Sequence, residues 1–131
     1  MSAWRIKMRE RLVRNTEEPE NEQACWLWKR KKDREHYGQL NVWVPGLGKT
    51  FTMKSHILLW LLTMTEPEDI ETADDAYLAY KELTLSGLHL DHSCCARACA
   101  NPDHLKPETA LDNMRLRDHR RKTLPMLWGA R

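Results

Sequence analysis

The chain has 131 residues, of which 31% are charged and 41% hydrophobic, a composition that suits one globular domain and excludes a disordered chain. Its formal net charge is only +2, so no strong overall excess of either sign defines its partners. The longest apolar run, ILLWLLTM, is too short to span a membrane, and the basic N-terminal stretch has no apolar segment behind it that would make it a secretory signal.

The near-neutral total hides a segregation of charge. Basic residues gather in Arg5–Arg14, Lys29–Arg34 and Arg115–Lys122, and acidic ones in Glu17–Glu22 and Glu66–Glu82. A basic stripe attracts a polyanion through its local field, whatever the total charge. The alternative is that each run is a solvated helix face.

The first half of the chain predicts a short helix followed by a sheet. Strict alternation of Leu40, Val42 and Val44 with polar residues indicates a half-buried strand, and PGLG supplies a turn before the alternation resumes. The expected elements are a helix over Ala3–Arg14, a loop over Glu17–Gln23, a short strand over Cys25–Trp28, and a hairpin of strands Tyr37–Val44 and Lys49–Met53.

The second half predicts two helices, a short strand and a further helix. Ser55 is the expected N-cap of the apolar helix that ends at Met64, and Thr72 that of a helix over ADDAYLAYKEL, which Ser86-Gly87 would end. LHLD reads as a short strand. Thr109 with Asp112 fits a capping box for a helix through Asn113 toward Arg120.

These elements predict an α+β fold in a single domain, 1–131. Its expected parts are a basic helix and acidic loop (1–24), a β-sheet (25–54), a helical segment (55–87), a segment that holds most of the cysteines (88–122) and a C-terminal tail (123–131).

Metal-binding side chains are concentrated in LHLDHSCCARACANPDHL, which holds all but one of the four cysteines and three of the six histidines. Without a secretory signal, thiols or metal ligands are favoured over disulfides. Cys99, His104 and either Cys94 or Cys95 would bind a structural zinc, with Cys25 as the fourth ligand. Four protein ligands leave no open position for water, so such a zinc would hold structure and would not catalyse. The alternatives are disulfides or inert thiols, and for the cysteine left over, a small buried hydrophobe.

Three residues around this loop suggest chemistry. Asp91 and His92 end a strand, and Asn113 begins the next helix, so a loop pinned by zinc would bring them together. Oxygens of Asp91 and Asn113 suit Mg²⁺, and a neutral histidine beside them could take a proton from water. Taken singly, each also has a plain structural interpretation as a loop or helix residue.

The segment DHSCCARACANPDHLKPETALDN resembles the core of the HNH nucleases, in the zinc-bearing branch that includes the His-Cys box homing endonucleases and phage HNH endonucleases. The similarity lies in a histidine, two spaced cysteines, an Asn-Pro-x-His-Leu segment and an asparagine on the next helix. Upstream, CWLW from Cys25 and YGQL from Tyr37 are similar to the family's CW-x-W and YG stretches. The resemblance selects Cys94 over Cys95 as the ligand.

The resemblance implies a ββα-metal fold and a DNA endonuclease that requires Mg²⁺, for which Mn²⁺ would substitute. His92 would be the general base, and Asn113 and Asp91 the Mg²⁺ ligands, although His-Cys box relatives lack the aspartate. The metal would act as a Lewis acid at the leaving 3′ oxygen and leave 5′-phosphate and 3′-hydroxyl ends. The chain departs from the family in its long acidic segment and in His56-Ile57, where relatives often have His-Arg; Lys54, His56 and Arg97 are the substitutes for that arginine.

Double-stranded DNA is the expected partner. Gln39 and Asn41 on the alternating strand would read base edges, and basic residues would hold phosphates. Trp26, Trp28 and Trp43 are expected to pack rather than stack on bases. The expected phosphate contacts are Lys29, Arg30, Lys31, Lys32, Arg34, Arg97, Arg115, Arg117, Arg120 and Arg121.

Two further expectations concern the setting of the protein. The tail TLPMLWGAR would dock on its own domain or clasp a second subunit in a homodimer. The protein would act in the cytoplasm, or in the nucleus of a eukaryote, without contact with a membrane. The rival functions are a zinc-stapled DNA-binding module without activity and a zinc-built protein-interaction domain, against which the basic runs argue.

Overall fold

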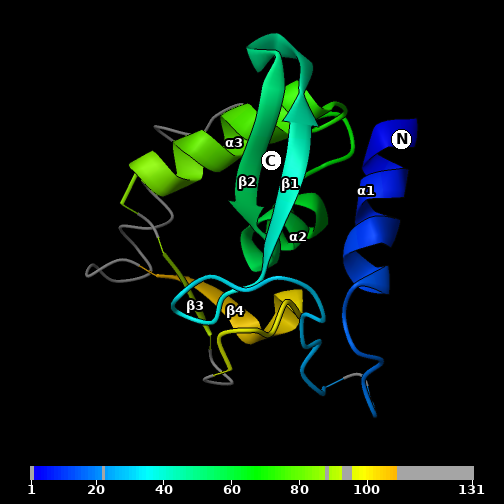
Figure 1. Cartoon of the computed structure of the whole chain (residues 1–131), viewed down its shortest axis with the longest axis vertical. Helices are drawn as coiled ribbons and strands as arrows, with labels where there is room; N and C mark the ends of the chain where they lie inside the picture. The colour runs from blue at the N-terminus through cyan, green and yellow to red at the C-terminus, as the bar shows by residue number, and fades with distance from the viewer. Residues whose placement is uncertain (1, 22, 88, 93–95, 109–131) are drawn as a thin grey trace.

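The computed structural model describes residues 2–21, 23–87, 89–92 and 96–108, with only the backbone of His89, Asp91, His92 and Glu108. The described chain forms three helices and two separate two-stranded antiparallel sheets. In Figure 1 the longer hairpin stands in front of the helices, and the shorter one lies below it. The expected α+β class is therefore confirmed. None of the described helices has the combination of length and apolar character that crossing a bilayer requires.

The longer sheet is the hairpin that the alternation predicted. Strand β1 (Gln39–Val44) pairs with β2 (Lys49–Lys54), with Asn41 opposite Thr52 and Trp43 opposite Thr50. The turn is a short 3-10 helix over Pro45–Leu47, which Gly48 ends in the left-handed conformation that glycine adopts without strain. Leu40, Val42 and Val44 point inward and are buried.

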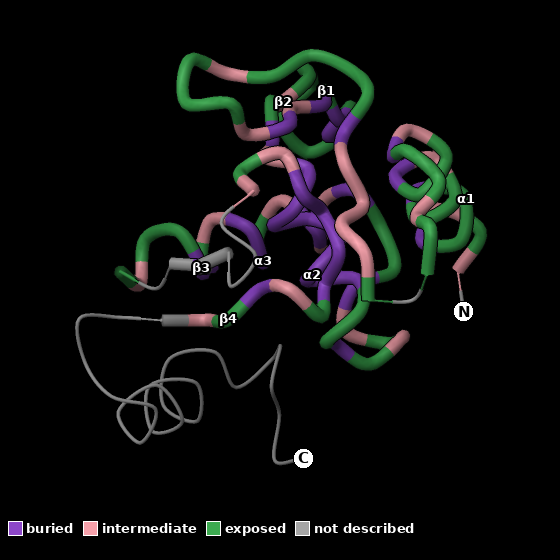
Figure 2. Tube along the Cα trace, turned by 90° about the horizontal axis from the view of Figure 1, so that it is seen from below, coloured by how far each residue is buried: buried purple, intermediate pink, exposed green. Residues whose placement is uncertain are grey.

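The core is built around α2 (Ser55–Met64), in which every residue through Leu62 is buried. A helix that is apolar on all sides must be covered on all sides. Helices α1 and α3, strand β2 and the 3-10 turn Pro102–His104 all contact it, and Figure 2 shows the buried residues gathered around it. The helix starts one position earlier than expected: Ser55 is its first residue, Lys54 its N-cap, and no side chain caps it.

Helix α3 (Ala73–Leu85) follows its sequence signals. Thr72 accepts a hydrogen bond from the Asp75 N–H, and the Asp75 carboxylate accepts one from the Thr72 N–H, which completes a capping box. Ser86 is the C-cap and Gly87 follows with a positive φ. Ala76, Ala79 and Leu83 form its buried face.

Helix α1 (Ala3–Arg14) has the expected bounds, but its first arginine has an unexpected role. Arg5 is 3% exposed and donates hydrogen bonds to the carbonyls of Leu62, Thr65, Glu66 and Ile70. Burial lowers the pKa of its guanidinium, but arginine stays charged in proteins. Its charge therefore anchors α1 to the end of α2 and takes no part in an exposed basic surface.

The shorter sheet pairs β3 (His89–His92) with β4 (Leu105–Glu108), so that His92 lies opposite Leu105 and Asp91 opposite Lys106. The cysteine-rich loop connects the two strands. The sequence predicted β3 but not β4, which is short and contains Pro107. The helix expected from Thr109, with the rest of 109–131, lies outside the described residues.

The segment Cys25–Trp28 is not the strand that its composition predicted. It makes isolated bridges on two sides, Trp28 to Thr16 and Leu27 to Cys99. The segment therefore connects the chain after α1 with the cysteine-rich loop. The expected sheet over 25–54 is limited to the β1–β2 hairpin. This position between loops is what brings Cys25 to the metal-binding stretch.

Candidate metal centre and nucleic-acid surface

Three metal-binding side chains meet where the Cys25 segment crosses the cysteine-rich loop. The Cys25 Sγ, the Cys99 Sγ and one ring nitrogen of His104 all lie within 4.8 Å of one another. The His104 Nδ1 is 3.6 Å from the Cys25 Sγ and 3.5 Å from the Cys99 Sγ. Cys99 is buried, and the other two are half-buried. Cys25 and Cys99 are not joined by a disulfide.

Backbone hydrogen bonds hold the two segments in this position. The Trp28 N–H donates to the Ala98 carbonyl at 2.9 Å, and the Ala100 N–H donates to the Trp26 carbonyl at 2.8 Å. Leu27 and Cys99 pair between these two bonds. These backbone bonds fix Cys99 opposite the Cys25 segment. The backbone alone therefore brings the side chains of the cluster together.

A second set of hydrogen bonds orients the ligand atoms. The His104 Nε2–H donates to the Gln23 carbonyl at 2.7 Å; a carbonyl can only accept, so Nδ1 is the nitrogen left for a metal. The Asn101 N–H donates to the Cys99 Sγ at 3.4 Å. The buried Asn101 amide donates to the Ala24 carbonyl and accepts from the Asp103 N–H, and so ties the loop to the residue before Cys25.

The donor set and its spacing fit zinc. Thiolate sulfur and imidazole nitrogen on one tetrahedral zinc lie about 3.5 Å apart, given bonds of about 2.3 and 2.0 Å. The two observed sulfur–nitrogen distances, 3.6 and 3.5 Å, match that separation. The group of Cys25, Cys99 and His104 could therefore hold a metal such as zinc. The expected fourth ligand, Cys94, lies outside the described residues, as does its neighbour Cys95.

Of the residues expected to carry chemistry, the structure describes two by their backbone. Asp91 and His92 are the last two residues of β3, and they pair with the first two residues of β4, directly after His104. The strand thus ends where the cysteine-rich loop begins. Asn113 lies outside the described residues.

A pocket lined by one lysine and one histidine lies beside β3. It has a volume of about 270 Å³, and Tyr37, Lys54, His56 and Leu90 are among the residues that line it. The Lys54 ammonium and the Arg97 guanidinium lie 4.6 and 5.7 Å from the centre of the Tyr37 ring. His56 stacks on the same ring at 5.1 Å, so Lys54, His56 and Arg97 all lie around one aromatic ring.

Tyr80 also lines this pocket, and Gly38 lies next to one of its lining residues, Tyr37. Burial raises the pKa of the Tyr80 phenol, which stays neutral; its oxygen accepts a hydrogen bond from the Lys54 N–H. Gly38 follows Tyr37 where there is no room for a side chain, because a Cβ there would meet the Trp28 ring and the Ser55 hydroxyl. The Tyr-Gly pair therefore has a packing reason here.

The expected DNA-contacting residues of the first half of the chain are at the surface. The basic loop that precedes β1 exposes its five cations, Asn41 is exposed and Gln39 half-exposed. The Asn41 side chain accepts a hydrogen bond from Thr52. Arg97 is exposed and donates to the Glu35 carbonyl. Four further candidates lie outside the described residues: Arg115, Arg117, Arg120 and Arg121.

The tryptophan expectation needs a correction. Trp28 is buried and Trp26 packs against the core, as expected, but Trp43 is 57% exposed. It lies on the outward face of β1 because it alternates with Val42 and Val44. The alternation in the sequence already assigns Trp43 to the face opposite Leu40, Val42 and Val44, so the pattern itself indicated an outward ring.

Comparisons with known proteins identify no relative: no family model, no curated protein and no solved structure matches the chain.

Proposed function

We propose that the protein is an HNH-type DNA endonuclease that requires Mg²⁺ and is held together by a structural zinc ion. The observation that carries the proposal is the assembly of Cys25, Cys99 and His104 between two paired strands, the first of which ends in Asp91-His92. The sequence offered Cys25 as a ligand because it is the only cysteine outside the cysteine-rich stretch, and the resemblance to HNH nucleases supports that choice.

In this proposal the zinc ion holds the loop and the chemistry belongs to its neighbours. His92 is the general base that takes a proton from water, and Asp91 and Asn113 hold Mg²⁺. A bound Mg²⁺ supplies a Lewis acid for the charge that develops on the leaving oxygen. A separate zinc with four protein ligands is consistent with this division, because a closed zinc site leaves no position for substrate.

The pocket beside β3 supports the proposal on the substrate side. A phosphodiester carries a negative charge, and the pocket brings Lys54 and His56 to the strand whose end holds Asp91 and His92. In this chain Lys54 and Arg97, both held against the Tyr37 ring, would bind the phosphate in place of the arginine that Ile57 replaces.

The experiment is plasmid cleavage with Mg²⁺ by the purified protein and by His92→Ala, with the zinc content of both measured. We expect the wild type to cut, and His92→Ala to keep its zinc and its fold but lose cleavage by about a hundredfold or more. His89→Ala is the matched control, since it removes the same side chain from the same strand, and it should keep activity.

Two outcomes would contradict the proposal. If the wild type binds DNA but cuts no sequence with any of several divalent ions, the chain is a zinc-stapled binding module. If His92→Ala and His89→Ala lose activity equally while both retain zinc, His92 is not the base.

A further inference from the structure

We infer that helix α1 belongs to the nucleic-acid surface, and that the cleft between α1, the loop before β1 and the start of β1 binds backbone phosphates of double-stranded DNA. The choice of DNA as the source of the phosphates rests on the proposed function. Neither the sequence similarity nor the expected contact residues include α1.

The cleft is lined by cations from two separate segments. Arg11 and Arg14 come from the last turn of α1, and Arg30 and Lys31 from the loop. Among the described residues that line its volume of about 310 Å³, none is acidic. Four like charges around one hollow repel one another, and an anion placed there would relieve that repulsion.

Hydrogen bonds hold two of these cations, Arg11 and Arg30, in place. The Asn15 side chain accepts from the Arg30 Nε–H at 2.8 Å, and its amide donates to the Arg11 carbonyl. The Arg11 guanidinium donates to the Asn41 carbonyl at 3.2 Å. The C-cap residue of α1 thus fixes the loop to the helix, so part of the entropy cost of ordering long side chains is met before binding.

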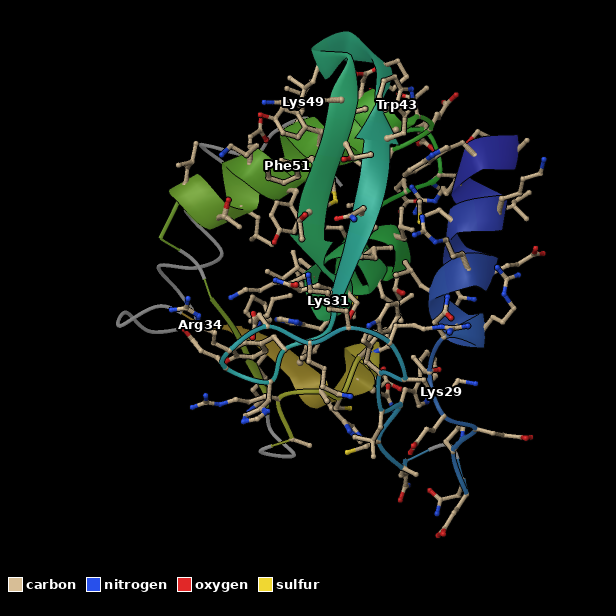
Figure 3. The ribbon with its side chains drawn as sticks, viewed as in Figure 1. Lys29, Lys31, Arg34, Trp43, Lys49 and Phe51 are labelled. Atoms are coloured by element: carbon tan, nitrogen blue, oxygen red, sulfur yellow. The ribbon has the colours of Figure 1, made fainter. Side chains whose placement is uncertain are left out.

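The cleft is continuous with the expected DNA-binding surface. Gln39 lines the cleft and is also the first residue of β1, whose outward face carries Asn41 and the exposed Trp43. Figure 3 shows Lys31 at the foot of β1, Lys29 below the end of α1 and Arg34 toward the β3 side.

The loop therefore connects two binding regions. At one end the Lys29 N–H donates to the Asn15 carbonyl of α1, and at the other the Glu35 carbonyl accepts from Arg97. Cations thus extend from α1 to the pocket beside β3. A duplex that lies along this path would be held at α1 and cut near β3.

The test is DNA binding by the full-length, zinc-loaded protein without added Mg²⁺, so that binding is measured without cleavage. Affinity for two labelled duplexes of unrelated sequence is measured from 50 to 200 mM salt by fluorescence anisotropy. Each phosphate contact contributes about 0.9 to the slope of log affinity against log salt. We expect Arg14→Gln and Arg11→Gln each to reduce that slope by about this amount, equally for both duplexes, and to weaken binding at the lowest salt by about tenfold.

Two control variants distinguish the loss of a phosphate contact from a general loss of positive charge, and two measurements check that each variant is folded. Arg9→Gln removes the same charge from the other side of α1, because successive helix residues are about 100° apart, and Arg9 does not line the cleft. Arg9→Gln should leave the salt slope unchanged. Arg14→Lys, which keeps the charge, should have a salt slope close to that of the wild type. Circular dichroism and zinc content check the fold of each variant.

The outcomes distinguish this inference from the proposed function. If Arg9→Gln and Arg14→Gln change the slope alike, or if the wild type does not bind DNA, the cleft is not a phosphate site. If Arg14→Gln reduces the slope and Arg9→Gln does not, in a protein that never cuts DNA, the cleft is a phosphate site and the endonuclease proposal fails.

Discussion

At the scale of single residues, the metal centre depends on atoms that surround its ligands as much as on the ligands. Asn101 holds the Ala24 carbonyl and its own N–H reaches the Cys99 sulfur, while Gln23 fixes the His104 ring. Groups that orient metal ligands in this way tune metal affinity by about ten- to a hundredfold. The resemblance includes Asn101 in its Asn-Pro-x-His-Leu segment without giving it a role, so its part in the cluster needed the structure.

The adjacent cysteines give a prediction at this scale. Cys94→Ser should lose bound zinc, because a hydroxyl replaces a thiolate ligand, and Cys95→Ser should keep one zinc ion per chain. The measurement is zinc content after dialysis, with the melting temperature of each variant as a check on folding. The reverse pattern would make Cys95 the ligand. If both variants retain zinc, neither cysteine is a ligand, and Cys25, Cys99 and His104 are the protein ligands.

At the scale of elements, a buried charge joins α1 to the end of α2, beside the apolar contacts of Met8 and Leu12 with the core. The Arg5 guanidinium reaches the carbonyls of Leu62 and Thr65 at the end of α2, where the helix dipole favours a cation. The last carbonyls of an α-helix have no partner within the helix, and here the arginine side chain donates to them. The same hydrogen bonds therefore satisfy carbonyls at the C-terminal end of α2 and fix the position of α1.

Replacing this arginine should be costly. Arg5→Met should lower the free energy of unfolding by about 2–4 kcal/mol, because the α2 carbonyls lose their donor while remaining buried. Arg9→Met, on an exposed position of the same helix, should change it by less than about 0.5 kcal/mol. Chemical denaturation of the two variants checks the difference, and equal costs would show that Arg5 is not an anchor.

At the scale of the whole molecule, the sequence predicted elements better than it predicted how they meet. Alternation from Gln39 to Val44 and the Thr72 cap are local signals, and the structure follows both. Arg5 and Cys25 have roles that depend on partners more than fifty residues away, and nothing local distinguishes Arg5 from the exposed cations that follow it. Strand β4 was missed for the same reason, since its pairing with β3 comes from across the loop.

Metal removal should therefore open one part of the molecule first. We expect a chelator to lower the melting temperature and to expose the Trp28 and Ala100 amides to hydrogen exchange, while the β1–β2 amides remain protected. Hydrogen exchange by mass spectrometry before and after chelation measures this. Uniform loss of protection would mean that the metal centre and the hairpin unfold as one unit.

The separation of the metal ligands along the chain has a consequence for biosynthesis. Cys99 and His104 are five residues apart, whereas Cys25 and His104 are separated by 79, and both sheet strands of the longer hairpin and helices α2 and α3 lie between. On the ribosome, Cys25 emerges long before its partners, so the hairpin and these helices must form without the metal. Closing so long a loop is entropically cheap only once the intervening chain is already compact. If the cluster of Cys25, Cys99 and His104 holds zinc as proposed, metal capture is a late step of maturation. A cell poor in zinc would then accumulate chains whose core has formed while the Cys25 segment is not yet tied to the cysteine-rich loop.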